Sequence, residues 1–90
     1  MTSYMLADAG PADSPPLSAR PGQFVKLMFV PYPGTDGIPE AIWVQVTSAD
    51  GDNYSGALWN VPTPGEGLPG FGDRVTFAGR HIIAVDDDRP

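Results

Sequence analysis

The chain has 90 residues, which is enough for one domain, and its 11 Gly and 11 Pro predict short segments separated by turns. It contains no cysteine, which excludes disulfides, thiolate metal ligands and a cysteine nucleophile. The formal net charge of −6, from 11 acidic and five basic residues, disfavours binding to nucleic acid, because such surfaces need clustered Lys and Arg.

The first residues lack the basic segment followed by an apolar run that marks a secretory signal. No part of the sequence approaches the ~20 consecutive apolar residues that a membrane-spanning helix needs. We therefore expect a cytoplasmic protein that does not contact membranes.

Residues 1 to 22 hold four of the 11 Pro, together with many Ala, Ser, Asp and Gly, and show neither a helical nor a strand period. Such a segment buries too little apolar surface to offset its ordering entropy, so it is predicted to be an extended or flexible N-terminal arm. Tyr4, Met5 and Leu6 are the apolar exception. They are suited to anchor the arm on its own domain or on a neighbouring subunit.

Five strands are predicted after the arm. The first, "QFVKLMFVPY" at 23 to 32, is β-branched and aromatic, and both of its alternating sets of side chains are apolar, which predicts a strand covered on both faces. The Pro- and Gly-rich segments at 31 to 39 and 62 to 72 are predicted loops. The other strands are "AIWVQVTS", "NYSGALWNV", "DRVTF" and "HIIAV".

This pattern predicts a mainly β domain over residues 23 to 85, followed by an acidic tail at 86 to 90. Five short strands with a long loop after the first fit a small half-open SH3-like barrel, whereas a two-sheet sandwich usually needs about seven. An OB-like barrel is the nearest alternative.

Trp43 and Trp59 lie on the two strands joined by "ADGDN", in which Asp-Gly is a strong hairpin signal. Side chains alternate along a strand, so the length of the loop decides which residues share a face. An odd loop such as 50 to 52 places Trp43 opposite Trp59 and Val44 opposite Leu58, whereas an even loop puts the two Trp on opposite faces. We favour the odd register, because it gathers the aliphatic residues on one face. It leaves the Trp pair outside the main core, either covered by the N-terminal arm or contacting a partner, and the alternative is that one or both Trp complete a small core.

Candidate catalytic and metal-binding residues are few. Asp50 and Asp52 resemble the start of a calcium loop, but Tyr54 occupies the fifth position, so a turn is expected. His81, the one His, is predicted to be a surface residue of the last strand, because no catalytic motif accompanies it. We expect no cofactor, no metal and no enzymatic activity.

The pattern "FVK", a loop, "EAIW", a turn, "GALWNVP", then "GDRVTF" and "HII" resembles the bacterial YegJ-like family, domain of unknown function 2314, over about residues 23 to 85. The chain has Ala41 where that family often has His. The resemblance implies a bacterial or phage-associated cytoplasmic β domain and no reaction. The positions that carry it are Phe24, Val25, Lys26, Glu40, Ile42, Trp43, Gly56, Leu58, Asn60, Pro62, Gly72, Asp73, Val75, Phe77 and Ile82.

The function expected from the sequence is a non-catalytic protein-binding module. Its candidate binding residues are Trp43, Trp59, Tyr32, Glu40 and Asn60. Glu40 and Asn60 are included because they lie on facing strands near the open end of the hairpin, where they suit structural hydrogen bonds or a ligand. The alternative is a structural or accessory component of a larger assembly, such as a phage virion, in which the arm threads onto a neighbour.

Overall fold

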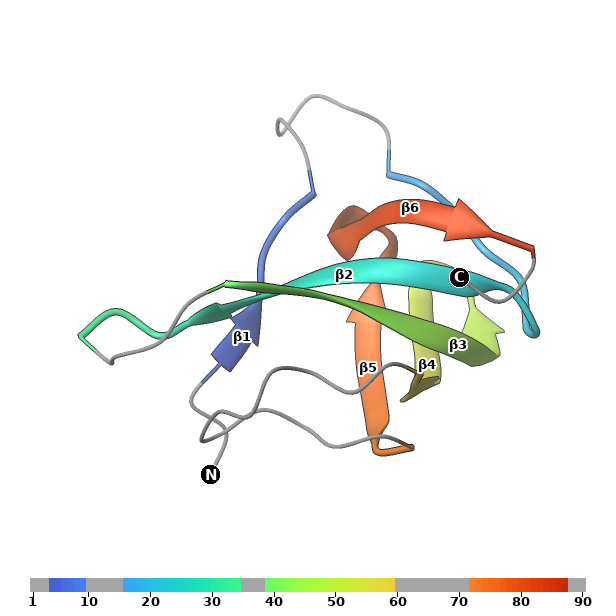
Figure 1. Ribbon diagram of the computed structural model, residues 1–90. Helices are drawn as coiled ribbons and strands as arrows, with labels where there is room; N and C mark the ends of the chain where they lie inside the picture. The colour runs from blue at the N-terminus through green and yellow to red at the C-terminus, as the bar shows by residue number, and fades with distance from the viewer. Residues whose placement is uncertain (1–3, 10–15, 35–38, 60–71, 88–90) are drawn as a thin grey trace.

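The computed structural model describes residues 4–9, 16–34, 39–59 and 72–87. These form six strands and one short 3-10 turn (Figure 1). In chain order the elements are β1 (Tyr4–Leu6), β2 (Phe24–Pro31), β3 (Glu40–Asp50), β4 (Asn53–Leu58), β5 (Arg74–Ala78), η1 (Gly79–His81) and β6 (Ile82–Asp86). Within the described ranges, no helix has the length and hydropathy needed to cross a membrane.

The strands form one antiparallel sheet that curls into a nearly closed barrel (Figure 1). Its order is β1-β2-β3-β4-β5, and β6 also pairs with β2. One edge of β2 pairs with β3, and two strands share the other edge. On that edge β6 pairs with Phe24 to Leu27, and β1 pairs with Phe29 to Pro31. The predicted mainly β fold with five strands is confirmed by β2 to β6, and the barrel is consistent with the SH3-like architecture.

The N-terminal segment contributes β1, which sequence analysis did not predict as a strand. Tyr4 is 7% exposed and belongs to the core, whereas its neighbour Met5 is 41% exposed on the outer face. The register pairs Met5 with Val30 and Leu6 with Phe29. The sequence left open whether Tyr4 to Leu6 anchor the arm on their own domain or on a neighbouring subunit. In the structure they pair with β2 of their own domain.

The hairpin of β3 and β4 combines a tight turn with a β-bulge. The turn has two residues, Gly51 and Asp52, and the left-handed Gly51 (φ 61) is the conformation that a type II′ turn requires at its first position. Near the turn Ser48 pairs with Ser55, but farther along Val46 pairs with Gly56, so Thr47 is the extra, bulged residue. Its hydroxyl donates a hydrogen bond to the carbonyl of Ser55 (3.2 Å).

The bulge corrects one prediction and confirms another. The expected three-residue loop is wrong, because the turn has two residues. The expected pairing of Val44 with Leu58 is nevertheless confirmed, because the bulge supplies the odd residue that the loop lacks. The inner face therefore carries the predicted aliphatic set, each at most 1% exposed: Ile42, Val44, Val46 and Leu58.

Gly56 lies next to the bulge, where β3 and β4 leave no room for a side chain. A Cβ at this position would lie 2.5 Å from both the carbonyl oxygen of Gln45 and a methyl group of Val44. These neighbours are backbone and fully buried side chain, so neither can move aside easily. The absence of a side chain at residue 56 is thus a requirement of the register.

The Gly56→Ala variant is expected to lose about 1–3 kcal/mol of stability, because the added methyl overpacks the β3–β4 contact. Urea unfolding measures the loss. Thr76→Ala, an exposed change on the neighbouring strand β5, is the control and should stay within about 0.5 kcal/mol of wild type. Equal midpoints for the two variants would contradict the close approach.

Adjacent residues of β1 give a matched test of whether this strand belongs to the core. Tyr4→Ala should cost about 3 kcal/mol, because it empties a buried aromatic site, whereas Met5→Ala should cost less than about 0.5 kcal/mol. Thermal unfolding of both variants distinguishes the two effects. A free N-terminal arm would make both changes neutral.

Candidate functional site

Trp43 and Trp59 lie on the outer face of the barrel. The backbone amide of Trp59 donates to the carbonyl of Trp43 (2.8 Å), which continues the pairing of Val44 with Leu58 by one position. Because side chains alternate along each strand, both indoles project away from the aliphatic core. Each is half-buried, so part of each ring remains accessible.

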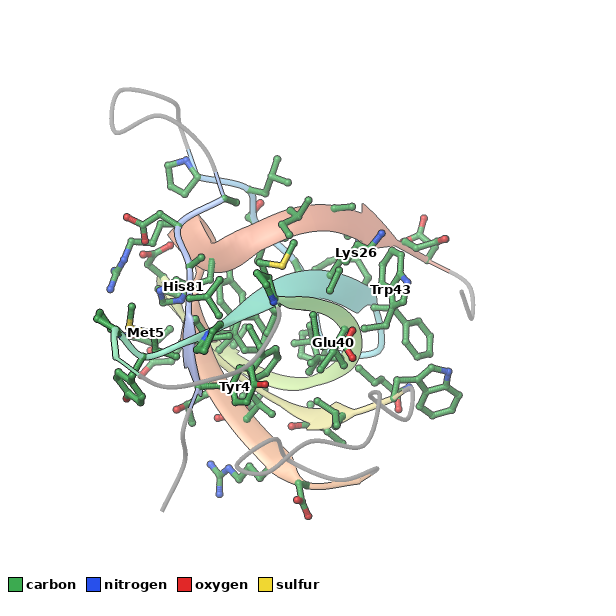
Figure 2. The ribbon with its side chains drawn as sticks, turned by 60° about the vertical axis from the view of Figure 1, so that its left-hand side comes forward. Tyr4, Met5, Lys26, Glu40, Trp43 and His81 are labelled. Atoms are coloured by element: carbon green, nitrogen blue, oxygen red, sulfur yellow. The ribbon has the colours of Figure 1, made fainter. Side chains whose placement is uncertain are left out.

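Two residues of β2 contact the indoles. The Phe24 and Trp59 rings meet edge to face, with centroids 5.0 Å apart and an interplanar angle of 66°. The ammonium of Lys26 lies 5.6 Å from the centre of the Trp43 ring, and the register pairs these two residues directly (Figure 2). Aromatic and cation–π contacts of this kind fix the orientation of the rings.

The aromatic group is one end of a longer apolar surface that runs along β2. The outward residues of this strand are Phe24, Lys26, Met28 and Val30, and we call them the outer stripe of β2. All but Phe24 are half-buried, and Phe24 is 4% exposed yet lies outside the central core cluster. The two Trp flank one end of the stripe, and Met5 flanks the other (Figure 2). The sequence indicates this surface because residues 24 to 30 are apolar at both of their alternating sets of positions, apart from Lys26.

Two other predicted binding residues, Glu40 and Tyr32, do not join the Trp pair. Glu40 is opposite the core residue Phe29, so it shares the inward side of β3 and not the side of Trp43. Tyr32 is 44% exposed just beyond β2, and its distance along the strand from Lys26 corresponds to about 20 Å. Asn60 lies outside the described residues.

A second surface is a groove of about 440 Å³ formed by β3, β4, β5 and η1, which we call the polar groove. Its residue types are those of a hydrolytic site, namely hydroxyls, a carboxylate and an imidazole. It is lined by Ser48, Asp50, Asn53, Tyr54, Ser55, Thr76, Phe77, Ala78, Arg80 and His81.

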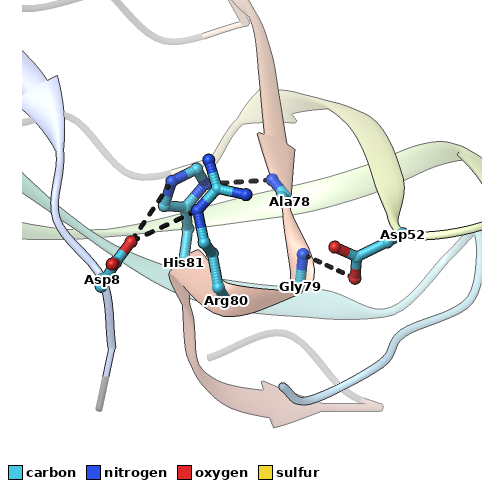
Figure 3. Close-up of polar contacts among 6 residues, drawn as sticks. All are labelled: Asp8, Asp52, Ala78, Gly79, Arg80 and His81. Atoms are coloured by element: carbon cyan, nitrogen blue, oxygen red, sulfur yellow. Dashed lines mark hydrogen bonds and ion pairs between the residues drawn. The ribbon is translucent and has the colours of Figure 1, made fainter. Parts of the chain in front are cut away.

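The two ring nitrogens of His81 face groups other than the hydroxyls of this groove. Its Nδ1 accepts a hydrogen bond from the backbone amide of Ala78 (3.0 Å), so the neutral ring carries its proton on Nε2, which lies 3.9 Å from the Asp8 carboxylate (Figure 3). The hydroxyl of Ser55 accepts from the guanidinium of Arg74 (3.3 Å). A nucleophile–base pair requires a hydroxyl hydrogen-bonded to the imidazole. Here the imidazole Nδ1 bonds the Ala78 amide, and the Ser55 hydroxyl bonds Arg74.

The prediction that His81 is a surface residue of the last strand is wrong. It is the third residue of η1, and its side chain is 14% exposed. There it bonds the amide that precedes the turn, which is half of a capping box. The pattern "AGRHII" did not distinguish such a turn from the start of a strand.

Asp52 has a structural partner in the same region. Its carboxylate accepts a hydrogen bond from the amide of Gly79 (3.2 Å), and so does its carbonyl (3.2 Å) (Figure 3). This bond supports the expected reading of "DGDN" as a turn. The described residues hold no group of three or more His, Cys, Asp or Glu that would bind a metal ion.

No family model, no curated protein and no solved structure matches the chain. Its function is therefore inferred from the outer stripe of β2 with the Trp pair, and from the polar groove.

His81 makes stability depend on pH. Burial lowers the pKa of His81 below its usual value of 6.5, and the charge of Arg80 lowers it further, against the opposing effects of Asp8 and Asp52. The unfolded chain consequently binds a proton more readily than the folded one as the pH falls through 6.5. The contribution of His81 to stability is present above that pH and is lost below it.

His81→Gln retains an acceptor for the Ala78 amide but does not titrate. The urea midpoint of the wild type should therefore fall more between about pH 7.5 and about pH 5 than that of the variant, because only the wild type protonates at residue 81. Carboxylates titrate equally in both proteins and cancel in the comparison. Parallel pH profiles would show that the imidazole is not held neutral.

Proposed function

We propose that this protein is a non-catalytic protein-binding module of the cytoplasm, and that it binds its partner through Trp43, Trp59 and Lys26, with the buried Phe24 holding the Trp59 ring. The observation that carries the proposal is the placement of both Trp side chains on the face that the core does not use. Aromatic residues that are partly exposed and held by neighbouring rings are typical anchors of protein interfaces.

The neighbours of the Trp pair indicate the chemistry of the partner. Trp59, which packs against the buried Phe24, offers an apolar contact, and beside it the Lys26 ammonium lies over the face of Trp43. A partner that places an aliphatic or aromatic side chain on Trp59 and a carboxylate near Lys26 would satisfy both. Met28 and Val30 extend this contact along β2, and Met adapts readily to different shapes.

The absence of catalysis is part of the proposal. It is supported by the commitment of His81 Nδ1 to the amide of Ala78 and of the Ser55 hydroxyl to Arg74. The resemblance to the YegJ-like family stays a prediction and adds no reaction. Binding to protein rather than to nucleic acid is supported by the net charge of −6.

Tyr32 and Glu40 are secondary candidates in this proposal, because they do not lie beside the indoles, and Asn60 stays a prediction outside the described residues. The alternative function, a component of a larger assembly, required the N-terminal arm to thread onto a neighbour. Residues 4 to 6 pair with β2 of their own chain, so this alternative depends on an exchange of that strand between chains.

The test is affinity capture from the native host, followed by titration calorimetry with the captured partner. Trp43→Ala should weaken binding at least ~30-fold, which is the effect of a hot-spot residue of about 2 kcal/mol. Partner binding should also reduce the quenching of Trp fluorescence by acrylamide, because it covers the exposed parts of the indoles.

The matched control is Thr76→Ala, which removes a side chain from the polar groove and leaves the Trp face intact. It should bind with wild-type affinity. If Thr76→Ala abolishes binding while Trp43→Ala does not, the groove is the binding surface and the proposal is wrong. Unfolding curves of both variants exclude a loss of fold as the cause.

A further inference from the structure

Strand β1 occupies a strand-acceptor site on the edge of β2. The last strand, β6, covers this edge only as far as Leu27, and β1 pairs with Phe29 to Pro31 beyond it. Without β1, the amides and carbonyls of that stretch of β2 would be an open sheet edge, and the inner end of the barrel would lose the buried ring of Tyr4. The site is therefore built to receive a strand with an aromatic residue facing inward.

Residues 4 to 9 bind this site as one unit. Tyr4 enters the core, and Leu6 packs against it. The amide of Ala7 donates to the carbonyl of Met28 (3.0 Å), and the amide of Ala9 donates to the carbonyl of Arg80 (2.8 Å). Asp8 forms an ion pair with the guanidinium of Arg80 (3.4 Å) (Figure 3). Each of these contacts joins the segment to residues that lie much later in the sequence.

We propose that residues 4 to 9 exchange between two copies of this chain, so that each copy donates β1 to the acceptor site of the other. The exchange creates no new contact, because the segment meets the same partners in either arrangement. The result is a two-fold symmetric dimer held by two copies of β1, each with its Tyr4 in the partner's core. Trp43 and Trp59 lie at the other end of β2, so the dimer leaves the proposed binding face unchanged.

The length of the connection limits the geometry of the dimer. Leu17 and Pro16 lie against Gly79 of their own barrel, and Ala9 is bound at Arg80, so the crossing segment runs from Ala9 to Pro16. Seven residue steps reach about 25 Å when extended. Because Gly79 and Arg80 both belong to η1, the two η1 turns of an exchanged dimer must lie within that distance of each other.

The balance between monomer and dimer depends on concentration. In the monomer the segment is tethered to its own site, and a short tether provides an effective concentration in the millimolar range. Exchange is therefore expected to be minor in dilute solution and to grow as the chain concentration approaches this value. Refolding at high concentration populates the exchanged dimer, because during folding the acceptor site can bind β1 of its own chain or β1 of another chain.

Disulfide trapping tests the exchange in the full chain. The protein has no cysteine of its own, and Met5 lies directly opposite Val30 on the outer face, at a separation that a disulfide can bridge. Met5→Cys and Val30→Cys chains are mixed in equal amounts, unfolded in denaturant, refolded together at about 0.5 mM and oxidised. We expect a covalent heterodimer with one chain of each kind, identified by its intact mass and reversed by reductant.

The control pairs Met5→Cys with Lys26→Cys, which lies on the same strand and the same face but about 13 Å farther along. The first mixture should give at least about five times more heterodimer than the control, and its yield should rise with concentration. Equal yields in the two mixtures would overturn the proposal.

The chain carrying both Met5→Cys and Val30→Cys provides a second measurement. Refolded in dilute solution, it should form an internal disulfide and run as a monomer, which verifies the register of β1 on β2. Refolded at about 0.5 mM, it should also give disulfide-linked dimers. Monomers alone at every concentration would likewise overturn the exchange.

Discussion

The bulge at Thr47 decides which residues of the β3–β4 hairpin enter the core. A two-residue turn alone would set Trp59 opposite Val44 and turn Leu58 outward, because a shift of one position reverses every side chain of a strand. The extra residue restores Leu58 to the interior and Trp59 to the surface. The aliphatic core and the outward placement of the Trp pair therefore depend on the same irregularity, which is held by the Thr47 hydroxyl and by the lack of a side chain at Gly56.

The outer stripe of β2 is unusual because the core-forming strand is apolar on both sides. Its inward residues fill the barrel, and of its outward residues Lys26, Met28 and Val30 are only partly covered. The ring of Trp59 packs against Phe24, which is buried, and the Lys26 ammonium keeps a charge within the apolar surface. A surface of this composition is compatible with water when free. Because most of it is apolar, little hydration free energy is lost when a partner covers it.

Much of the fold was predictable from periodicity and turn residues, since alternation along residues 24 to 30 and 42 to 46 marks strands whichever way they pair. The pairing of Val44 with Leu58 was also predictable, although the bulge that produces it was not, because a loop of three residues and a loop of two with a bulge give the same register. Strand β1 was missed because three residues carry too little periodicity, and its stability comes from long-range contacts of Tyr4. Phe24 and Lys26 were also missed as neighbours of the indoles, because only the pairing of distant strands brings them together.

The double hydrogen bond from Gly79 to Asp52 links the turn of the β3–β4 hairpin to η1, which connects β5 to β6. Residues 52 and 79 are far apart in the sequence, yet neither connection can loosen without breaking this contact. We therefore expect both connections to fluctuate as one cooperative unit, with their amide hydrogens exchanging with solvent in a shared opening event. At this end of the barrel, one residue, Asp52, couples the motions of the two connections through its carboxylate and its carbonyl.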